Sequence, residues 1–128
     1  MAVKIFTSSI IESALPDLEL QELIAKFKRY KETNVAPLDF GRDAPYDRPS
    51  AAKSEELQHL HLQSTEKWTL RTIQFRRTSD THLVYCYGWK NPSHYLLIAI
   101  IEDAHRKANN TLFMLSMAEL AQEFRYDH

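Results

Sequence analysis

The stretch from Gln74 to Tyr87, QFRRTSDTHLVYCY, carries the clearest strand signal of the chain, with a cationic turn in front of it. Thr81–Tyr87 is rich in β-branched and aromatic residues, and its side chains alternate as they do in a strand. Arg76 and Arg77 precede it, and the short polar side chains of Thr78–Asp80 favour a turn. A strand entered from a cationic turn is a candidate phosphate site. We expect Leu83, Tyr85 and Tyr87 on one strand face, and His82, Val84 and Cys86 on the other.

Outward from this stretch, the hydrophobic pattern predicts further strands and two helices. Strands are expected at Val3–Thr7, Leu57–Leu62 and Tyr95–Ile101, and the last is a continuous apolar run typical of a central strand covered on both sides. Helices are expected at Asp17–Lys31 and Thr111–Tyr126. The second helix is expected to bury Leu112, Leu115, Ala118, Leu120, Ala121 and Phe124.

Two segments are expected to be connections. Residues 33–54 hold three prolines and a glycine, which predicts a long irregular connection of the kind that is usually functional or mobile. Residues 102–110 are expected to form a charged loop. Short connections between the last three strands favour an antiparallel meander. We therefore predict one α+β domain over residues 1–128, an antiparallel sheet of about four strands with the N-terminal and C-terminal helices packed on one face.

Composition excludes several classes of protein. A net charge of -1 and a pI near 6.6 argue against a globally basic nucleic-acid binder, although Lys67–Lys90 holds five cations against one anion. The single cysteine, Cys86, cannot form an internal disulfide, and no zinc motif is present. No apolar run reaches the length of a membrane span and no signal peptide is visible, so we expect a cytoplasmic protein.

Two histidines stand out in the strand at Leu57–Leu62. Alternation places His59 and His61 on one face, about 7 Å apart. Such a pair suits proton transfer or metal binding, and it is also compatible with a structural role in a half-exposed sheet. In the FGRDAPYD run, Arg42 and the aspartates Asp43 and Asp47 either pair with each other and pin the loop or contact a ligand.

The chemistry open to these residues is limited by the motifs that are missing. The chain has no nucleophile elbow, phosphate-binding loop or dinucleotide fingerprint. The remaining His, Asp, Arg and Tyr side chains at strand ends match what metal-free RNA cleavage requires, namely a base, an acid and cations at the developing phosphorane.

Several blocks of the chain resemble a known family. FGRDAxYD at Phe40–Asp47, HxHL at His59–Leu62, QFxRTxDxHLVYC at Gln74–Cys86, LLIAI at Leu96–Ile100 and the terminal Phe124-Arg125 are similar to the YafO family of type II toxins. The resemblance implies a RelE-like fold. It also implies a metal-independent and cofactor-free mRNA interferase that cuts mRNA on the translating ribosome, contacts ribosomal RNA and is held inactive by an antitoxin. Contact with DNA is expected only through the antitoxin complex.

The wider RelE superfamily implies roles by order along the fold. In its histidine-rich branch, the matching positions here are His59 or His61, then Asp80, then His105. We expect His59 or His61 as general base, His105 as general acid, Asp80 orienting a histidine or ribose, and Arg77 with Arg42 stabilising the phosphorane. Further RNA or phosphate contacts are expected from Asp43, Arg76, His82, Lys67, Arg71 and Arg125.

Three alternatives stay open at this point. In the first, the chain is a noncatalytic RNA- or ribosome-binding inhibitor, and the cationic segment positions phosphate. A ParE-like toxin would instead act on gyrase and dispense with the histidines. The third is a metal site formed by His59, His61 and His105.

Overall fold

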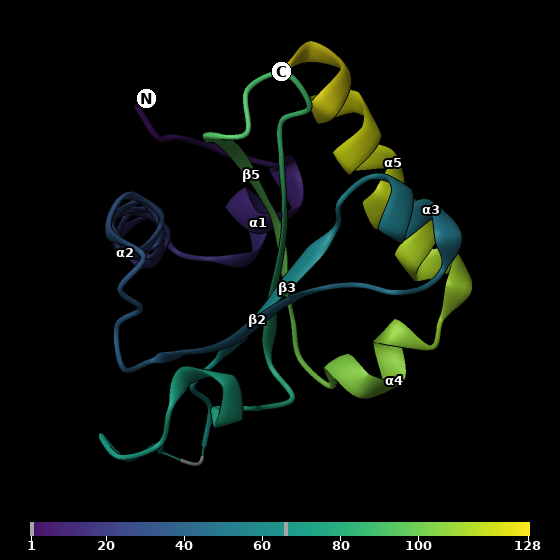
Figure 1. Cartoon of the computed structure of the whole chain (residues 1–128). Helices are drawn as coiled ribbons and strands as arrows, with labels where there is room; N and C mark the ends of the chain where they lie inside the picture. The colour runs from purple at the N-terminus through teal and green to yellow at the C-terminus, as the bar shows by residue number, and fades with distance from the viewer. Residues whose placement is uncertain (1, 66) are drawn as a thin grey trace.

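The computed structural model describes residues 2–65 and 67–128. In this part of the chain, one sheet contains five strands in the spatial order β1-β5-β4-β3-β2 (Figure 1). The presence of both helices and strands in the described residues confirms the α+β class. The strands are β1 (Lys4–Thr7), β2 (Phe40–Pro45), β3 (Gln58–Leu62), β4 (His82–Tyr87) and β5 (His94–Ile101). The helices are α1 (Ser9–Ala14), α2 (Asp17–Thr33), α3 (Ser50–Ser54), α4 (Ala104–Ala108) and α5 (Thr111–Asp127), with a 3-10 helix η1 at Gln74–Arg76.

The sheet is mixed rather than antiparallel throughout. β2 to β5 form an antiparallel meander, but β1 pairs with β5 in parallel, with Lys4 opposite His94. The expectation of an antiparallel sheet of about four strands is therefore wrong in the strand count and at this edge. The parallel pairing joins segments that lie far apart in the sequence, so no local pattern signals it.

The prediction of an irregular connection over residues 33–54 is also wrong, since β2 and α3 lie within it. β2 is the edge strand beside β3 in the described part of the chain, and its register shifts between Phe40 and Asp43. Proline and glycine are tolerated at such edges and bulges, so Gly41 and Pro45 do not interrupt the strand. The charged segment 102–110 likewise contains a short helix, α4, and α1 was not predicted.

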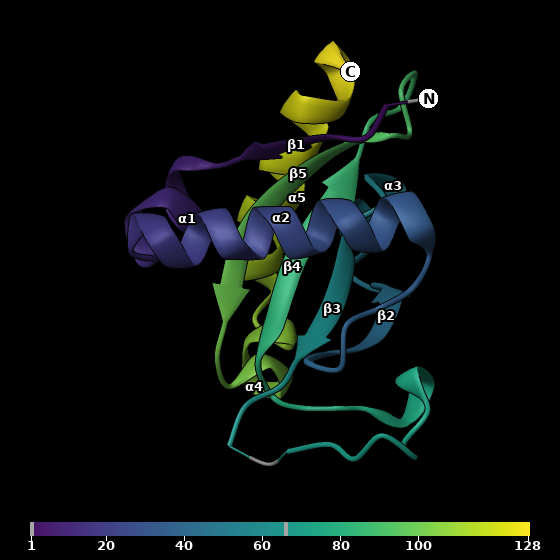
Figure 2. The same cartoon turned by 90° about the vertical axis from the view of Figure 1, so that its left-hand side faces the viewer.

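Helices cover both faces of the sheet, not one as predicted (Figures 1 and 2). On one face α1 and α2 enclose a core that includes Phe27, Leu60 and Leu83, while α3, α4 and α5 cover the other core. The alternation of β4 explains the division, because Leu83 and Tyr85 enter the first core and Val84 and Cys86 enter the second. The apolar run of β5 is buried on both sides, as its sequence predicts.

The two long helices are confirmed with small differences. α2 extends to Thr33, and the C-cap residue that follows, Asn34, adopts a left-handed conformation. α5 begins where the Asn110 side chain accepts a hydrogen bond from the Phe113 N–H. Its predicted buried stripe is only partly right, because Leu112 is 81% exposed. The residues of α5 that are buried are Met114, Met117, Ala118, Ala121 and Phe124.

None of the helices in the described ranges has the length and apolar character needed to cross a membrane.

Candidate active site

A pocket of about 370 Å³ lies between the edge of the sheet and α4. Four histidines line it, together with Arg42 and Tyr46. Two of the histidines come from β3, one from β4 and one from α4. The fold therefore gathers imidazoles from three elements into one place. The four are His59, His61, His82 and His105.

The meander aligns three of these imidazoles. Alternation along β3 puts His59 and His61 on the pocket side, as predicted, while Leu60 enters the core on the other face. His61 pairs with His82 of β4 in the ladder, and their ring centroids lie 4.0 Å apart. The His59 ring lies 5.1 Å from that of His82 and 5.6 Å from that of His61. His82, which was predicted as an RNA contact, thus joins the predicted pair. The sequence did not indicate this grouping, because strand register is a long-range property.

Ser79 fixes the tautomers of two imidazoles through its backbone. Its N–H donates to His61 Nδ1 at 2.8 Å, so a neutral His61 carries its proton on Nε2. Its carbonyl lies 2.9 Å from His82 Nε2, which must donate, so the lone pair of His82 is on Nδ1. The remaining ring nitrogen is therefore an N–H donor in a neutral His61 and a lone-pair acceptor in a neutral His82. The polar turn at Thr78–Asp80 was predicted, but the roles of Ser79 in orienting two histidines were not.

Burial keeps these imidazoles neutral. Burial, with a smaller contribution from the neighbouring His82, lowers the pKa of His59 to about 4 and that of His61 to about 3. The pKa of His82 is also lowered, again mainly by burial. The His59 ring stacks on Tyr46 at 4.4 Å and 28°. Within the described residues, His59 Nδ1 and His82 Nδ1 are buried without a hydrogen-bond partner.

His105 is held differently, at the exposed side of the pocket. Asp80 Oδ1 accepts from the His105 backbone N–H at 2.9 Å and lies 2.6 Å from His105 Nδ1. The backbone bond and then the side-chain bond from His105 lower the pKa of Asp80. The Asp80 carbonyl also accepts from the Ala104 N–H, which ties the turn before β4 to α4. Asp80 was expected to orient a histidine or a ribose, and the histidine that it contacts is His105.

Arg42 is the predicted cation that lines the pocket. Its Nε donates to the Phe75 carbonyl at 2.8 Å, and its guanidinium lies 4.1 Å from the centroid of the Phe75 ring. Arg77 is placed differently, since it is buried and its Nε donates to the Phe40 carbonyl at 2.9 Å. Its guanidinium therefore holds β2 against the segment that precedes β4.

Asp43 lies away from the histidines, on the other face of the sheet. Its carboxylate accepts hydrogen bonds from the Tyr30 hydroxyl at 2.8 Å, the Lys31 ammonium at 3.0 Å and the Tyr85 hydroxyl at 2.6 Å. Arg42 and Asp43 are adjacent in a strand, so their side chains point to opposite faces. The structure does not bring Asp43 to the pocket.

The remaining predicted cations lie outside the pocket. Lys67, Arg71 and Arg76 are exposed on the segment between β3 and β4. Arg125 donates to the Tyr87 carbonyl at 2.8 Å and lies 3.5 Å from the Glu55 carboxylate. It thus fastens α5 to β4 and to the residue after α3.

Three pocket imidazoles are close enough together to resemble a metal-binding cluster. One nitrogen from each of His59, His61 and His82 lies within 4.8 Å of the other two. His105, predicted as the third ligand, is replaced by His82 in this trio. The lone pair of His61 Nδ1 is already engaged by the Ser79 N–H, so a three-histidine metal centre requires that hydrogen bond to break. The donor set therefore fits proton transfer better than metal ligation.

Comparison with known proteins agrees with the resemblance in the sequence. The family model described as "Toxin YafO, type II toxin-antitoxin system" matches residues 28–126. The mRNA interferase toxin YafO of Escherichia coli (strain K12) is 36% identical in an alignment of 129 positions, gaps included, that covers 96% of this chain and 98% of that protein. No solved structure matches the chain. The chain belongs to the YafO family of type II toxin–antitoxin toxins.

Proposed function

We propose that this chain is an mRNA interferase that cuts mRNA on the ribosome at the four-histidine pocket. One observation carries the proposal, namely that an exposed imidazole held by a carboxylate faces a cluster of neutral imidazoles across one pocket. The name of the Escherichia coli relative supports it. The RelE-like fold and the cytoplasmic location belong to the same proposal, since translating ribosomes are cytoplasmic.

The reaction is attack of a ribose 2'-oxygen on the adjacent phosphorus, with departure of the 5'-oxygen. The 2'-hydroxyl proton must go to a base, and a proton must reach the leaving oxygen. No metal or cofactor enters this scheme. The products are a 2',3'-cyclic phosphate and a 5'-hydroxyl.

The hydrogen bonds of Ser79 favour one assignment of base and donor. A neutral His61 presents an Nε2–H, so it acts as a donor to the phosphorane oxygens. His59 has no such restraint, and its Nε2 is the nitrogen left for a ligand because Nδ1 is buried. We therefore assign His59 as the general base. His82, whose ring lies 5.1 Å from that of His59 and 4.0 Å from that of His61, positions both rings.

His105 is assigned as the general acid. Its side chain is 82% exposed, and Asp80 holds Nδ1 so that Nε2 is free to protonate the 5'-oxygen. Each positioned proton transfer contributes typically about 10²–10⁴-fold to the rate. Arg42 supplies positive charge at the pocket wall, and Arg77 acts by holding the strand that carries Arg42.

Partners follow from the family and from the proposed reaction. A type II toxin has a cognate antitoxin, and the substrate we propose is mRNA in the ribosomal decoding region. Phosphate contacts with RNA are assigned to the exposed cations Lys67, Arg71 and Arg76.

Mapping of new mRNA 5' ends in cells tests the proposal. We expect induction of the chain to produce cuts in frame with codons, which vanish when initiation is blocked. His59→Ala, His61→Ala and His105→Ala should each remove most of the cuts, whereas His94→Ala, which alters a histidine outside the pocket, should not. Stalled ribosomes without new 5' ends would support a noncatalytic inhibitor instead. Arrest of DNA replication before protein synthesis would support a toxin that acts on gyrase.

A further inference from the structure

The segment before β4 combines positive charge with exposed apolar side chains. Residues 67–77, which we call the basic arm, contain four cations and no acidic residue. Exposed apolar side chains stand between the cations, with Leu70 at 89%, Ile73 at 62% and Phe75 at 66% exposure. Single exposed apolar side chains are ordinary on a protein surface, but three of them grouped within six residues mark an interaction site.

The basic arm is fastened to the sheet at several points. Gln74 Nε2 donates to the Gly41 carbonyl at 3.0 Å, and Arg77 Nε donates to the Phe40 carbonyl at 2.9 Å. The Trp68 backbone N–H donates to the Gln63 side chain at 3.0 Å. A surface that is fixed before binding loses less conformational entropy when a ligand arrives.

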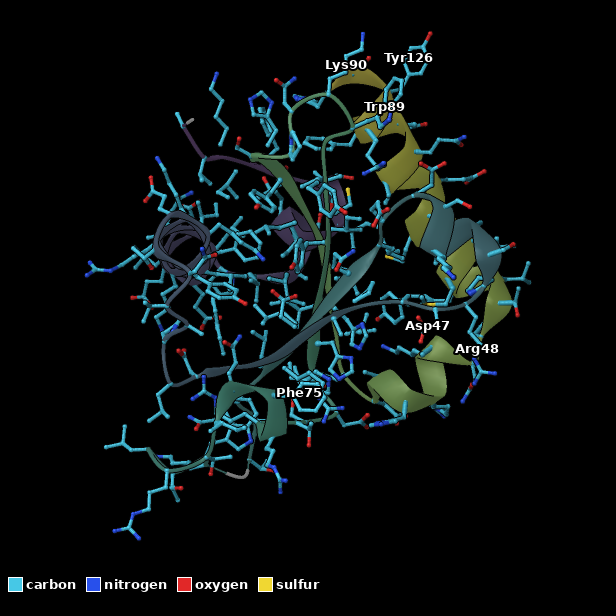
Figure 3. The ribbon with its side chains drawn as sticks, viewed as in Figure 1. Asp47, Arg48, Phe75, Trp89, Lys90 and Tyr126 are labelled. Atoms are coloured by element: carbon cyan, nitrogen blue, oxygen red, sulfur yellow. The ribbon has the colours of Figure 1, made fainter. Side chains whose placement is uncertain are left out.

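Phe75 connects the basic arm to the pocket. The Arg42 guanidinium lies over its ring at 4.1 Å and is also hydrogen-bonded to its carbonyl. Arg42 lines the histidine pocket, so Phe75 contacts a residue of the pocket wall. Figure 3 shows Phe75 at the opposite end of the molecule from Trp89 and Tyr126.

We propose that the basic arm is a binding site for single-stranded RNA, with Phe75 stacking on a base beside the scissile phosphate. Cations that track the backbone and aromatic rings that stack on bases are the two features shared by single-strand binding surfaces. The absence of any acidic side chain in residues 67–77 favours a polyanion over an acidic protein segment. The proposal rests on the proposed function for the position of the base relative to the cut, but RNA binding itself does not depend on cleavage.

Binding of an uncleavable RNA tests this directly. The probe is a fluorescent single-stranded oligonucleotide with 2'-O-methyl groups, whose blocked 2'-oxygens cannot attack, and the readout is anisotropy with the full chain. Phe75→Leu, which keeps an apolar side chain, should weaken binding about 5- to 150-fold, the effect of losing one base–aromatic stack. Phe75→Trp should bind close to wild type. Trp89→Leu is the matched control, since Trp89 is 69% exposed at the other end and its loss should leave binding unchanged.

Salt dependence separates charge from stacking. Arg71→Gln and Arg76→Gln should each lower the slope of log affinity against log salt by about 0.7, the value for one phosphate of a single strand. Phe75→Leu should leave that slope unchanged.

Several results would overturn the proposal. These are absence of RNA binding by the wild-type chain, equal affinity for wild type and Phe75→Leu, or equal weakening by Trp89→Leu. Loss of antitoxin binding in Phe75→Leu with RNA binding intact would assign the surface to a protein partner. If cleavage fails altogether while the binding pattern holds, the proposed function is wrong and the RNA site stands.

Discussion

Asp43 offers the sharpest test of how the fold supports the site, because its carboxylate is the centre of a polar network within a core. It accepts hydrogen bonds from Tyr30, Lys31 and Tyr85, and the side chains of Lys31 and Asp43 are only 15% and 13% exposed. Replacement by alanine leaves two hydroxyls and one ammonium without this acceptor. Breaking a buried ion pair by removing one partner typically costs about 3–5 kcal/mol.

The expected loss lies near the lower end of that range. The Lys31 ammonium retains a hydrogen bond to the Tyr85 hydroxyl at 2.9 Å, and it lies 4.7 Å from the ring centroid of Tyr30. We therefore predict that Asp43→Ala lowers the free energy of unfolding by about 3 kcal/mol. Urea denaturation followed by circular dichroism measures this quantity.

The chain provides a matched control in Asp39. This residue pairs with Lys26 at 2.8 Å, but the two side chains are 40% and 48% exposed. Asp39→Ala should change the unfolding free energy by only about 0–1 kcal/mol, the usual range for an exposed pair. Equal effects of the two substitutions would refute the reasoning. So would a stable Asp43→Ala protein that fails to bind RNA, since Asp43 would then contact the ligand as the sequence suggested.

Three further predictions concern the pH dependence of stability, the reactivity of the Cys86 thiol and the role of Asp80 in cleavage. The folded-state pKa values of about 4 for His59 and about 3 for His61 lie below the ordinary value of 6.5. Below pH 6.5 the unfolded chain therefore binds more protons than the folded chain. The free energy of unfolding should fall as the pH is lowered from 6.5 towards 4. From pH 6.5 to pH 5 each should contribute about 1–2 kcal/mol, measured by urea denaturation, and equal stability at both values would contradict the burial of neutral rings. Burial raises the pKa of Cys86 to about 12, so the native thiol should not react with a disulfide reagent at pH 8 until urea unfolds the chain, and rapid native labelling would contradict the packing. Asp80→Asn should slow mRNA cleavage by about 10²-fold while the melting temperature changes little, and unchanged cleavage would remove Asp80 from the mechanism.

The sequence predicted the central strands and both long helices because each carries a complete local pattern. β4 alternates between two cores, and β5 is apolar throughout, so its burial on both sides was readable. That burial also requires helices on both faces, a consequence that the prediction of one covered face missed. β2 was not predicted because Gly41 and Pro45 usually indicate a loop, and they are tolerated in a strand only at an edge or a bulge.

The histidines of the candidate pocket were predictable from the sequence, and their arrangement only partly so. Alternation placed His59 and His61 together. The resemblance implied that Asp80 orients a histidine or a ribose, and Asp80 contacts His105. The addition of His82 depends on the register of β3 against β4, which residues within one strand do not specify. Asp43 was grouped with Arg42 because the strand that separates their side chains was not recognised.

The most direct test of the central claim is the rate of mRNA cleavage on purified translating ribosomes. We expect His105→Ala and His59→Ala each to slow cleavage by at least about 10²-fold, as loss of a general acid or base does. His94→Ala, altered at a histidine that contacts His128 outside the pocket, should cleave at the wild-type rate. Full cleavage by both His105→Ala and His59→Ala would show that the four-histidine pocket is not the reaction centre.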